Sequence, residues 1–406
     1  MRNTLTGTQA VSLRCNRVPT YIDRYPAKMV SRLADQLIAN YASSCAHLLD
    51  PFCGSGAILV AARARGIPVS GADINPYAVL MSRVKTEGFS RKPGEDLSAG
   101  YIKRAACFGD GFPIAWPAAR YWFTSATLKK YERLRRVAVE MDLASSPEGR
   151  AILLAVALSV RLCSRADQRS PKPFISKLAI RQRRGRHFDP LGETSRLFKK
   201  LTDLYGAPSR LHSKVVRFDL AADVAAENVL GRFSHIITSP PYINAQDYFR
   251  NFKLELHVLE GVLPFTVSSV KNRFIGTERG CLGGRLSRQD VHLYRELLPD
   301  LVRMESTHPR HALVVMRYLS DMSRCCDALK RCLLPGGVLV IVCGDNLVGG
   351  YSVPTWQLVD TLLQARGLVI FDMFGDPIDC RMLPPKRKGH KGLIKQEVVS
   401  AFRLPQ

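Results

Sequence analysis

Two consecutive prolines between a serine and a tyrosine form the part of this chain best suited to chemistry. The run is Ser239-Pro240-Pro241-Tyr242, and it follows the strand-forming residues 235–237. Each proline fixes its own φ and has no N–H group, so the carbonyl groups here are stiff hydrogen-bond acceptors. The Ser239 side chain and the Pro240 carbonyl could therefore hold an amino group, while the Tyr242 ring stacks on a flat partner. A plain turn with Tyr242 in the core is the alternative.

A glycine-bearing run far upstream has the composition of a ligand-binding turn. Asp50-Pro51-Phe52-Cys53-Gly54-Ser55-Gly56 precedes an apolar stretch at helical spacing, residues 57–65. Gly54 and Gly56 allow the backbone to come close to a ligand. No Lys-Ser/Thr follows Gly56, which argues against a phosphate-binding P-loop. Leu59 stands where a dinucleotide-binding loop has its third glycine, so that kind of site is not supported either.

Two further carboxylates, Asp73 and Asp219, each end a short apolar stretch that predicts a strand. In sheets built from alternating strands and helices, ligands lie at the carboxyl ends of the strands. A carboxylate there can accept both hydroxyls of a ribose, which is the role we expect for Asp73, with Ile74 packed on an adenine ring. Asp73 could instead cap a helix that starts at Asn75-Pro76. Asp219 could be a structural carboxylate.

The stretch Leu48 to Val79 resembles the first two motifs of class I S-adenosylmethionine-dependent methyltransferases. Its Asp-Pro-Phe-Cys-Gly-Ser-Gly run is similar to the form found in the members that modify amino groups of DNA bases. The resemblance implies that Asp50 and the backbone of Gly54 and Gly56 lie near the methionine part of S-adenosylmethionine. It also implies that Asp73 binds the ribose.

Two weaker features extend this resemblance. Tyr25-Pro26-Ala27-Lys28-Met29 resembles the N-terminal motif that closes over the methionine end, although a plain helix started by a proline would explain the same residues. Asp219 is placed as in the family's contact to the adenine amine. The cofactor-binding residues that we expect are Tyr25, Pro26, Lys28, Asp50, Pro51, Phe52, Gly54, Ser55, Gly56, Asp73, Ile74 and Asp219.

The proline run resembles the catalytic tetrapeptide of the same enzymes, which makes Ser239, Pro240, Pro241 and Tyr242 the predicted catalytic residues. The amine of a base is a poor nucleophile because its lone pair is delocalised into the ring. Acceptors on both amine hydrogens would aim the lone pair at the methyl group, so the work is positioning and electrostatics. A base in a duplex must be flipped out to reach such a site.

The first residue of the tetrapeptide favours one base. Serine there is typical of N4-cytosine DNA methyltransferases, and residues 243–248 resemble the continuation seen in bacterial DNA methylases. Many N4-cytosine enzymes, however, place the catalytic motif before the cofactor motif. The opposite order, found here, is also seen among N6-adenine enzymes, which are the nearest alternative.

Two more distant alternatives stay open. RNA guanine-N2 methyltransferases use a similar Pro-Pro turn, but this chain carries no recognisable RNA-binding module. The chain could also be an inactive cofactor-binding partner of a DNA-binding protein, although its complete Ser239 to Tyr242 run argues against that.

Strands alternate with helices on both sides of a long interruption, which predicts an α/β fold. We expect a doubly wound, mostly parallel, seven-stranded Rossmann-like sheet covered on both faces. Residues 1–85 and 213–406 would form the catalytic domain, and residues 86–212 a largely helical insertion that recognises the target sequence. The expected strands are residues 47–50, 68–72, 214–218, 234–238, 338–343, 368–374 and 397–402. The expected helices are residues 57–65, 127–141, 149–162, 291–304, 323–333 and 355–365, and residues 312–316 form a short strand or the end of a helix.

A net charge of +24, from 59 Lys and Arg against 35 Asp and Glu, favours a polyanionic partner. Nucleic acid is the common one, anionic membrane is the rival, and an inert basic surface is the third reading. Three basic segments, residues 181–186, 271–288 and 381–395, are candidates for salt-sensitive phosphate contacts. We expect double-stranded DNA with a flipped target base as the partner, and the existence of a restriction endonuclease partner stays open.

Other composition features narrow the class of protein. The longest apolar run, residues 151–160, is about half of the roughly 20 residues that a membrane span needs. The N-terminus has no apolar signal core. The cysteines form no C-x-x-C pair, and adjacent Cys325-Cys326 cannot clamp a tetrahedral metal in the usual way. We therefore expect a reduced, cytoplasmic chain that acts on nucleoid DNA without zinc or disulfides.

Overall fold

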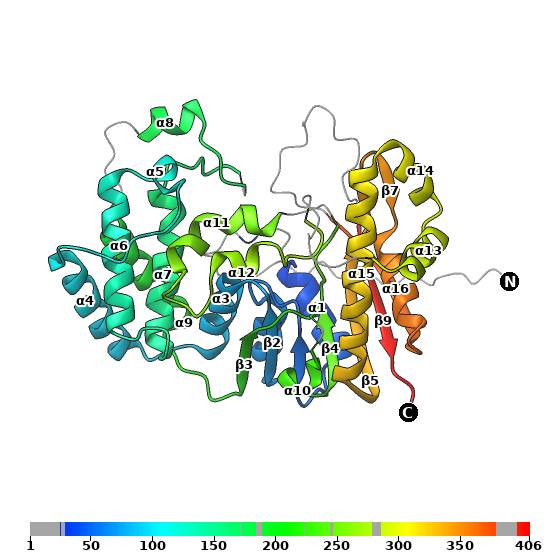
Figure 1. Ribbon diagram of the computed structural model, residues 1–406. Coiled ribbons are helices and arrows are strands. Elements are labelled where there is room, and N and C mark those ends of the chain that lie inside the picture. The colour runs from blue at the N-terminus through cyan, green and yellow to red at the C-terminus, as the bar shows by residue number, and fades with distance from the viewer. Residues whose placement is uncertain are drawn as a thin grey trace.

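The computed structural model describes residue 25 and residues 29–170, 172–183, 189–222, 224–243, 247–277, 286–378 and 396–406 (Figure 1). The described helices are α1 (Ser31–Tyr41), α2 (Ala57–Ala64), α3 (Pro76–Glu87), α4 (Arg91–Cys107), α5 (Ala119–Trp122), α6 (Ser125–Glu140), α7 (Pro147–Cys163), α8 (Lys177–Arg183), α9 (Pro190–Tyr205), α10 (Ala226–Leu230), α11 (Tyr248–Leu259), α12 (Val267–Lys271), α13 (Arg288–Leu297), α14 (Asp300–Thr307), α15 (Pro309–Cys332) and α16 (Thr355–Gln364). The strands are β1 (Leu48–Asp50), β2 (Val69–Asp73), β3 (Ser213–Arg217), β4 (Phe233–Thr238), β5 (Leu333–Gly344), β6 (Asn346–Val348), β7 (Tyr351–Val353), β8 (Val369–Pro377) and β9 (Gln396–Arg403).

Within these residues, seven strands form one sheet in the order β3-β2-β1-β4-β5-β9-β8. The first five pair in parallel, and β9 runs antiparallel to both β5 and β8. The chain builds outward from β1 to β3, then returns to the other side of β1 and builds outward again from β4. The predicted doubly wound, mostly parallel, seven-stranded sheet is confirmed. In such a sheet, ligands bind at the carboxyl ends of the strands where the order reverses, which here lies between β1 and β4.

Both faces of the central strands are buried, and neighbouring residues of each of these strands supply opposite faces. Leu48 belongs to the core that includes α1 and α2, whereas Leu49 belongs to the core that includes α15 and α16. In β4, Ile237 belongs to the core with α1 and α2, and Ile236 belongs to the core with α15 and α16. Central parallel strands buried on both sides are for this reason nearly continuous in apolar residues.

Several helices begin where the sequence offers a capping side chain followed by a proline. The Asn75 side chain accepts a hydrogen bond of 3.1 Å from the Tyr77 amide at the start of α3, and Ser146 caps α7 in the same manner. Pro76 and Pro147 then take the first helical position, where a missing N–H group costs nothing. Asn75, and not Asp73, is therefore the cap of α3.

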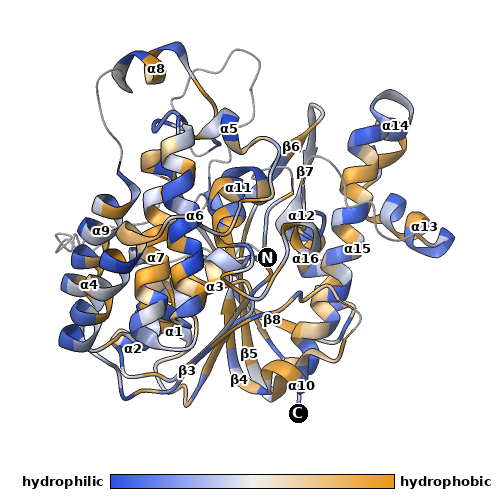
Figure 2. Cartoon of the chain, turned by 60° about the vertical axis from the view of Figure 1, so that its left-hand side comes forward, coloured by the Kyte–Doolittle hydropathy of each residue, from blue (hydrophilic) through white to orange (hydrophobic). Residues whose placement is uncertain are grey.

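Helices α4 to α9 are the regular elements described between α3 and β3, so the insertion is helical as predicted. Helix α7 lies at its centre, hydrophobic along most of its length (Figure 2) and buried almost throughout. It packs against α4, α6 and α9 of the insertion and also against α3 and α11 of the sheet domain. The insertion therefore shares one hydrophobic core with the sheet domain.

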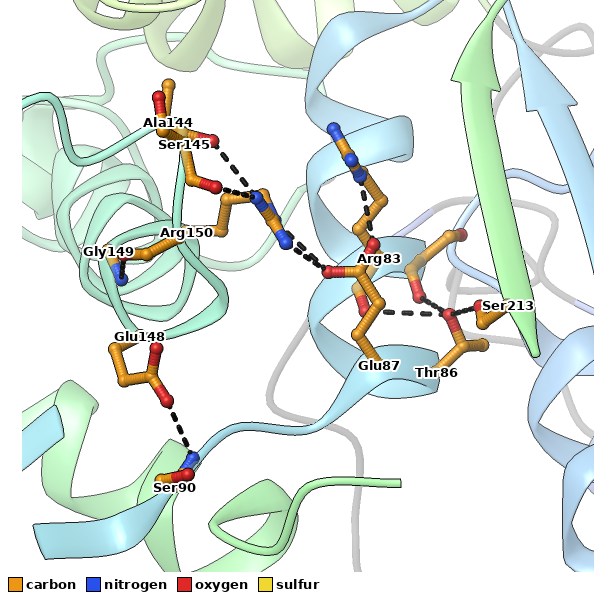
Figure 3. Close-up of polar contacts among 12 residues, drawn as sticks. Arg83, Thr86, Glu87, Ser90, Ala144, Ser145, Glu148, Gly149, Arg150 and Ser213 are labelled. Carbon is orange, nitrogen blue, oxygen red and sulfur yellow. Dashed lines mark hydrogen bonds and ion pairs between the residues drawn. The ribbon is translucent and has the colours of Figure 1, made fainter. Parts of the chain in front are cut away.

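A buried ion pair also ties the insertion to the fold (Figure 3). The guanidinium of Arg150 in α7 donates to one carboxylate oxygen of Glu87, the last residue of α3, over 3.1 and 2.6 Å. Its remaining nitrogen donates to the carbonyls of Ala144 and Ser145, and the other oxygen of Glu87 accepts from Arg83. The Arg150 and Glu87 side chains are only 9% and 17% exposed. Loss of one partner would leave a charge buried without its counterion.

Several stretches differ from the expected elements, and β5 begins at Leu333, the last residue of the helix expected at residues 323–333. The helix expected at residues 291–304 is two helices, α13 and α14, because Pro299 interrupts the run between them. Residues 312–316, which could not be assigned from the sequence, lie inside the 24-residue helix α15. Its fully buried residues recur at helical spacing, at Ala312, Val315, Leu319 and Met322.

Membrane-spanning helices, metal-binding clusters and disulfide bonds are not seen in the described part of the chain. None of its helices is long and apolar enough to cross a membrane. No group of three or more His, Cys, Asp or Glu side chains within it could hold a metal ion. Its cysteines are free thiols, with Cys325 and Cys326 buried in the core.

Candidate active site

A cavity opens at the carboxyl ends of β1 to β4, on both sides of the point where the strand order reverses. The space between its lining residues is about 850 Å³, which includes space open to solvent. The predicted site residues that line it are Tyr25, Asp50, Pro51, Phe52, Gly54, Ser55, Asp73, Ile74, Asp219, Ser239 and Pro241. Residues from five separate stretches of sequence thus meet at one place.

Other predicted residues lie elsewhere, and some lining residues were not predicted. Gly56, Pro240 and Tyr242 lie next to lining residues without lining the cavity themselves. Pro26 and Lys28 lie outside the described residues. The lining residues that were not predicted as site residues are Met29, Cys53, Ala57, Ile58, Phe218, Leu220, Tyr248, Arg273, Phe274 and Ile275.

The turn after β1 depends on its two glycines. Gly54 and Gly56 adopt left-handed φ angles of +48° and +82°. A Cβ atom on Gly54 would lie 3.1 Å from the Tyr25 ring, and one on Gly56 would lie 2.9 Å from the Ser82 hydroxyl. That hydroxyl donates to the Gly54 carbonyl over 2.9 Å, which holds the turn against α3. The glycines therefore allow both the turn and the close approach of Tyr25 above it.

Asp50 connects the two predicted motifs directly. One of its carboxylate oxygens accepts from the Thr238 hydroxyl over 2.6 Å and from the Phe52 amide over 3.2 Å. Burial raises the pKa of Asp50 to about 7, and these two hydrogen bonds oppose the rise. Because Thr238 is the last residue of β4, this contact fixes the glycine turn relative to the proline turn.

Asp73 ends β2 beside the same turn. Its carboxylate accepts from the Gly54 amide over 2.9 Å and from the Asn75 amide over 2.8 Å, one bond to each oxygen. Burial raises the pKa of Asp73 to about 6, and the two bonds oppose the rise. Each carboxylate oxygen has a second lone pair. Asp73 can therefore still accept two hydroxyl groups from a ligand in the cavity.

Asp219, two residues after β3, forms an ion pair across the cavity wall. One of its carboxylate oxygens lies 2.8 Å from the Arg273 Nε, and the other accepts from the Ala221 amide over 3.1 Å. Arg273 belongs to residues 271–288, one of the basic segments that the sequence analysis predicts as candidates for phosphate contacts. The structure instead brings its half-exposed guanidinium to the lining of this cavity.

Aromatic rings form a further wall of the cavity. The Tyr25 ring stacks on Phe252 of α11 with centroids 4.9 Å apart, and its centroid lies 6.0 Å from that of Tyr248. Asp247 caps α11 by accepting from the Arg250 amide, which fixes the start of the helix at Tyr248. Burial raises the pKa of both lining tyrosines, so their hydroxyls stay protonated.

The proline turn presents only part of itself to the cavity. Ser239 and Pro241 line it, whereas Pro240 is buried and the Tyr242 side chain is only 7% exposed. The Tyr242 ring packs in the core and donates its hydroxyl to Glu397 over 2.6 Å. From the sequence we expected this ring to stack on the substrate base. In this conformation it cannot, because it does not line the cavity. Tyr248 and Phe274 are aromatic residues that do line the cavity.

The predicted basic segments are only partly described. Residues 381–395 lie outside the described residues, as do residues 184–186 and 279–285. Around α5 and α8, which lie beyond the carboxyl edge of the sheet (Figure 1), the exposed basic side chains are Arg120, Arg165, Arg169, Lys177 and Arg181. Arg169 pairs with Asp167 over 2.6 Å, and Arg165 donates to backbone carbonyls of α5. This end of the insertion is thus rich in positive charge.

In comparisons with known proteins, the chain is similar to methyltransferases. No family model matches it. A stretch of 65 residues is 43% identical to the type II methyltransferase M.MvaI of Kocuria varians, and it covers 15% of this chain and only 14% of that protein. The glycopeptide N-methyltransferase MtfA in complex with sinefungin is similar at 8% identity and a TM-score of 0.32, over 95% of this chain and 90% of that one. The rRNA methyltransferase aviRa of Streptomyces viridochromogenes is similar at 11% identity and a TM-score of 0.29, over 93% and 86% of the two chains.

Proposed function

We propose that this chain is an S-adenosylmethionine-dependent methyltransferase that modifies the exocyclic N4 amine of cytosine in double-stranded DNA. The observation that carries the proposal is the shared cavity, in which the glycine turn and Asp73 face the same space as Ser239 and Pro241. A cofactor on the first group would lie beside a substrate on the second. The 43% identical stretch in a type II methyltransferase supports the same class of reaction.

The residues around the glycine turn suit S-adenosylmethionine. The Ser55 hydroxyl is buried beside the turn and has no hydrogen-bond partner among the described residues. A buried hydroxyl without a partner is costly unless a ligand or water bonds it. Asp73 would accept the ribose hydroxyls, and Ile74 and Phe218 would pack on the adenine ring. When bound, S-adenosylmethionine supplies an electrophilic methyl group on a positively charged sulfur.

The proline turn would hold the amine that accepts the methyl group. Ser239, which lines the cavity, would accept one of its hydrogens, and the carbonyl of Pro240, which lies between the lining residues Ser239 and Pro241, would accept the other. Both contacts would turn the nitrogen lone pair toward the methyl carbon. Bound S-adenosylmethionine would supply the methyl group and leave without it, and the proton that the nitrogen releases would pass to solvent at the open side of the cavity. Positioning of this kind needs no covalent intermediate on the protein.

DNA as the substrate is supported by charge and by the insertion. The net charge of +24 favours a polyanion. The exposed basic residues near α5 and α8 lie beyond the carboxyl edge of the sheet, the same edge whose strand ends line the cavity. In our proposal the insertion, residues 86–212, contacts DNA around the flipped base and contributes the sequence preference.

The test is incorporation of labelled methyl groups from the cofactor into duplex DNA, followed by digestion to nucleosides. Label in N4-methylcytosine supports the full proposal, whereas label in N6-methyladenine keeps the reaction and changes the base. Label in RNA but not in DNA would overturn the DNA assignment. Ser239→Ala should bind the cofactor with unchanged affinity and lose at least 100-fold in turnover, as expected when an acceptor made for the reacting group is removed. Normal turnover in this variant would refute the acceptor role.

A further inference from the structure

Glu397 lies on β9, two strands away from the proline turn, and yet it contacts that turn. Because β9 runs antiparallel to β5, its first residues meet the carboxyl end of the parallel strands, and Glu397 is paired with Gly344, the last residue of β5. The Tyr242 side chain reaches across this strand end from the β4 side. Its hydroxyl donates to Glu397 Oε1 over 2.6 Å.

A second hydrogen bond continues from this contact to the cavity. The Ser239 hydroxyl donates to the Tyr242 hydroxyl over 3.4 Å. Ser239 lines the cavity, whereas Tyr242 and Glu397 do not. The three side chains therefore form a row that starts in the buried sheet and ends at the place proposed for the substrate amine.

The direction of this row follows from the chemistry of its inner end. An ionised carboxylate can only accept hydrogen bonds, and a tyrosine hydroxyl has one proton to donate. Tyr242 therefore gives its proton to Glu397, and its lone pairs can only accept. Ser239 must then direct its own proton toward Tyr242, which leaves its lone pairs for the cavity. Without the row, a serine hydroxyl rotates freely between donating and accepting.

We propose that Glu397 is a positioning residue for methyl transfer, which orients the Tyr242 and Ser239 hydroxyls so that Ser239 presents an acceptor to the substrate amine. The inference rests on the proposed function, because an amine needs an acceptor at this position and a carbonyl substrate would need a donor. The inner bond is short, as is usual for a hydroxyl that donates to a carboxylate. The outer bond is long, and such bonds in ligand-free sites commonly shorten when the substrate is bound.

The shift in the pKa of Tyr242 agrees with its role as the donor. Burial, and then the nearby carboxylate of Glu397, raise the pKa of Tyr242 well above its usual range, so the hydroxyl keeps the proton that it donates. Burial raises the pKa of Glu397, and Asp376 on β8 raises it further, while the bond from Tyr242 opposes both. The Tyr242 contact thus favours the ionised, acceptor-only form of Glu397.

The experiment is a double-mutant cycle on the turnover of duplex DNA. Tyr242→Phe removes the relay, and Glu397→Met removes the inner acceptor. We expect each to lower kcat about tenfold, the effect of one hydrogen bond of ordinary strength, with KM for DNA and Kd for S-adenosylmethionine within twofold of wild type. The double variant should be no slower than Tyr242→Phe alone, because both changes break the same row. Glu397→Gln, which keeps an acceptor oxygen, should recover most of the rate.

A matched control is available at the far edge of the sheet. Tyr41 donates its hydroxyl to Asp372 of β8 over 2.6 Å, the same pair of groups at the same distance, outside the lining of the cavity. Tyr41→Phe should leave kcat unchanged. Rates are compared per mole of cofactor-binding sites, so that unfolded protein does not count.

A wild-type rate in Tyr242→Phe would overturn the inference, even if Glu397→Met failed to fold. So would losses that multiply in the double variant, which would mean that the two residues act separately. If wild-type protein bound the cofactor but methylated neither DNA nor RNA, the proposed function would fall together with the inference.

Discussion

The Asp50 carboxylate accepts a 2.6 Å hydrogen bond from the hydroxyl of Thr238, which lies 188 residues further along the chain. The bond spans the long helical insertion in sequence and only one strand spacing in space, because β1 and β4 are neighbours in the sheet. It sets the distance between the turn proposed for the cofactor and the turn proposed for the amine. Its removal should therefore affect both stability and catalysis.

Thr238→Val keeps the size of the side chain and removes its hydroxyl. It leaves the buried Asp50 with one donor fewer, so we expect a loss of about 1–3 kcal/mol in the free energy of unfolding. Urea denaturation followed by fluorescence measures this loss, with Thr238→Ser, which keeps the hydroxyl, as the control. Equal stability of wild type and Thr238→Val would contradict the role of this bond.

The raised pKa of Asp50 predicts that the stability of the protein depends on pH. Its pKa in the folded protein is raised to about 7, whereas the unfolded chain has the ordinary value near ~4. Between these values the folded protein holds a proton that the unfolded chain has lost. Stability conferred by this group is therefore highest at low pH and falls as the pH rises to about 7.

Asp50→Asn removes this titration, so the difference in unfolding free energy between the variant and wild type is the quantity to measure. Wild type should lose a few kcal/mol relative to the variant between roughly pH 4 and pH 7, because one pKa unit corresponds to about 1.4 kcal/mol. A difference that stays constant over this range would show that the Asp50 pKa is not raised.

Asp73→Ala should weaken the binding of S-adenosylmethionine by at least about tenfold, since it removes the acceptor proposed for the ribose hydroxyls. It also removes the bond to the Gly54 amide, which helps to shape the turn. Calorimetry gives the affinity directly. The control is Asp35→Ala, which breaks only an exposed pair with Arg65 and should bind the cofactor like wild type. Unchanged affinity in Asp73→Ala would refute the ribose contact.

The ion pair between Glu87 and Arg150 should be sensitive to the loss of either partner. Arg150→Met leaves the Glu87 carboxylate in a mostly buried place without its main counterion, at an expected cost of about 3–5 kcal/mol. The double variant Glu87→Gln/Arg150→Met should recover much of this loss. The partly exposed Arg104–Glu140 pair is the matched control, and Arg104→Met should cost less than about 1 kcal/mol. A small effect of Arg150→Met in urea denaturation would mean that this pair does not anchor the insertion.

The fold was predictable where the signals are local. Gly54 and Gly56 in a run that ends a strand, and Asp73 at the end of the next strand, are separated by fewer than about 25 residues, as is usual within one βαβ unit. The period of apolar residues identified most strands and helices for the same reason. Residues 312–316 failed this test because a short apolar run fits a strand and a buried helix face equally well.

The site was less predictable because several of its residues depend on distant partners. The Tyr242 ring lies in the core because Glu397, 155 residues away, accepts its hydroxyl, and nothing near Tyr242 in the sequence signals this. In the sequence Arg273 is one of many basic residues, and only the structure shows that it lies beside Asp219. Tyr248 reaches the cavity because α11 begins there. Partner choice of this kind is a property of the assembled sheet, not of a local pattern.

The core that helix α7 shares with α3 and α11 has a consequence for protein engineering. In a modular enzyme, a recognition segment can be exchanged for that of a relative while the catalytic part stays intact. Here the exchange of residues 86–212 would strip the apolar support from α11, whose first residue, Tyr248, borders the cavity. New specificities would therefore have to be selected by substitutions on the exposed surface of the insertion, with its buried helices left as they are.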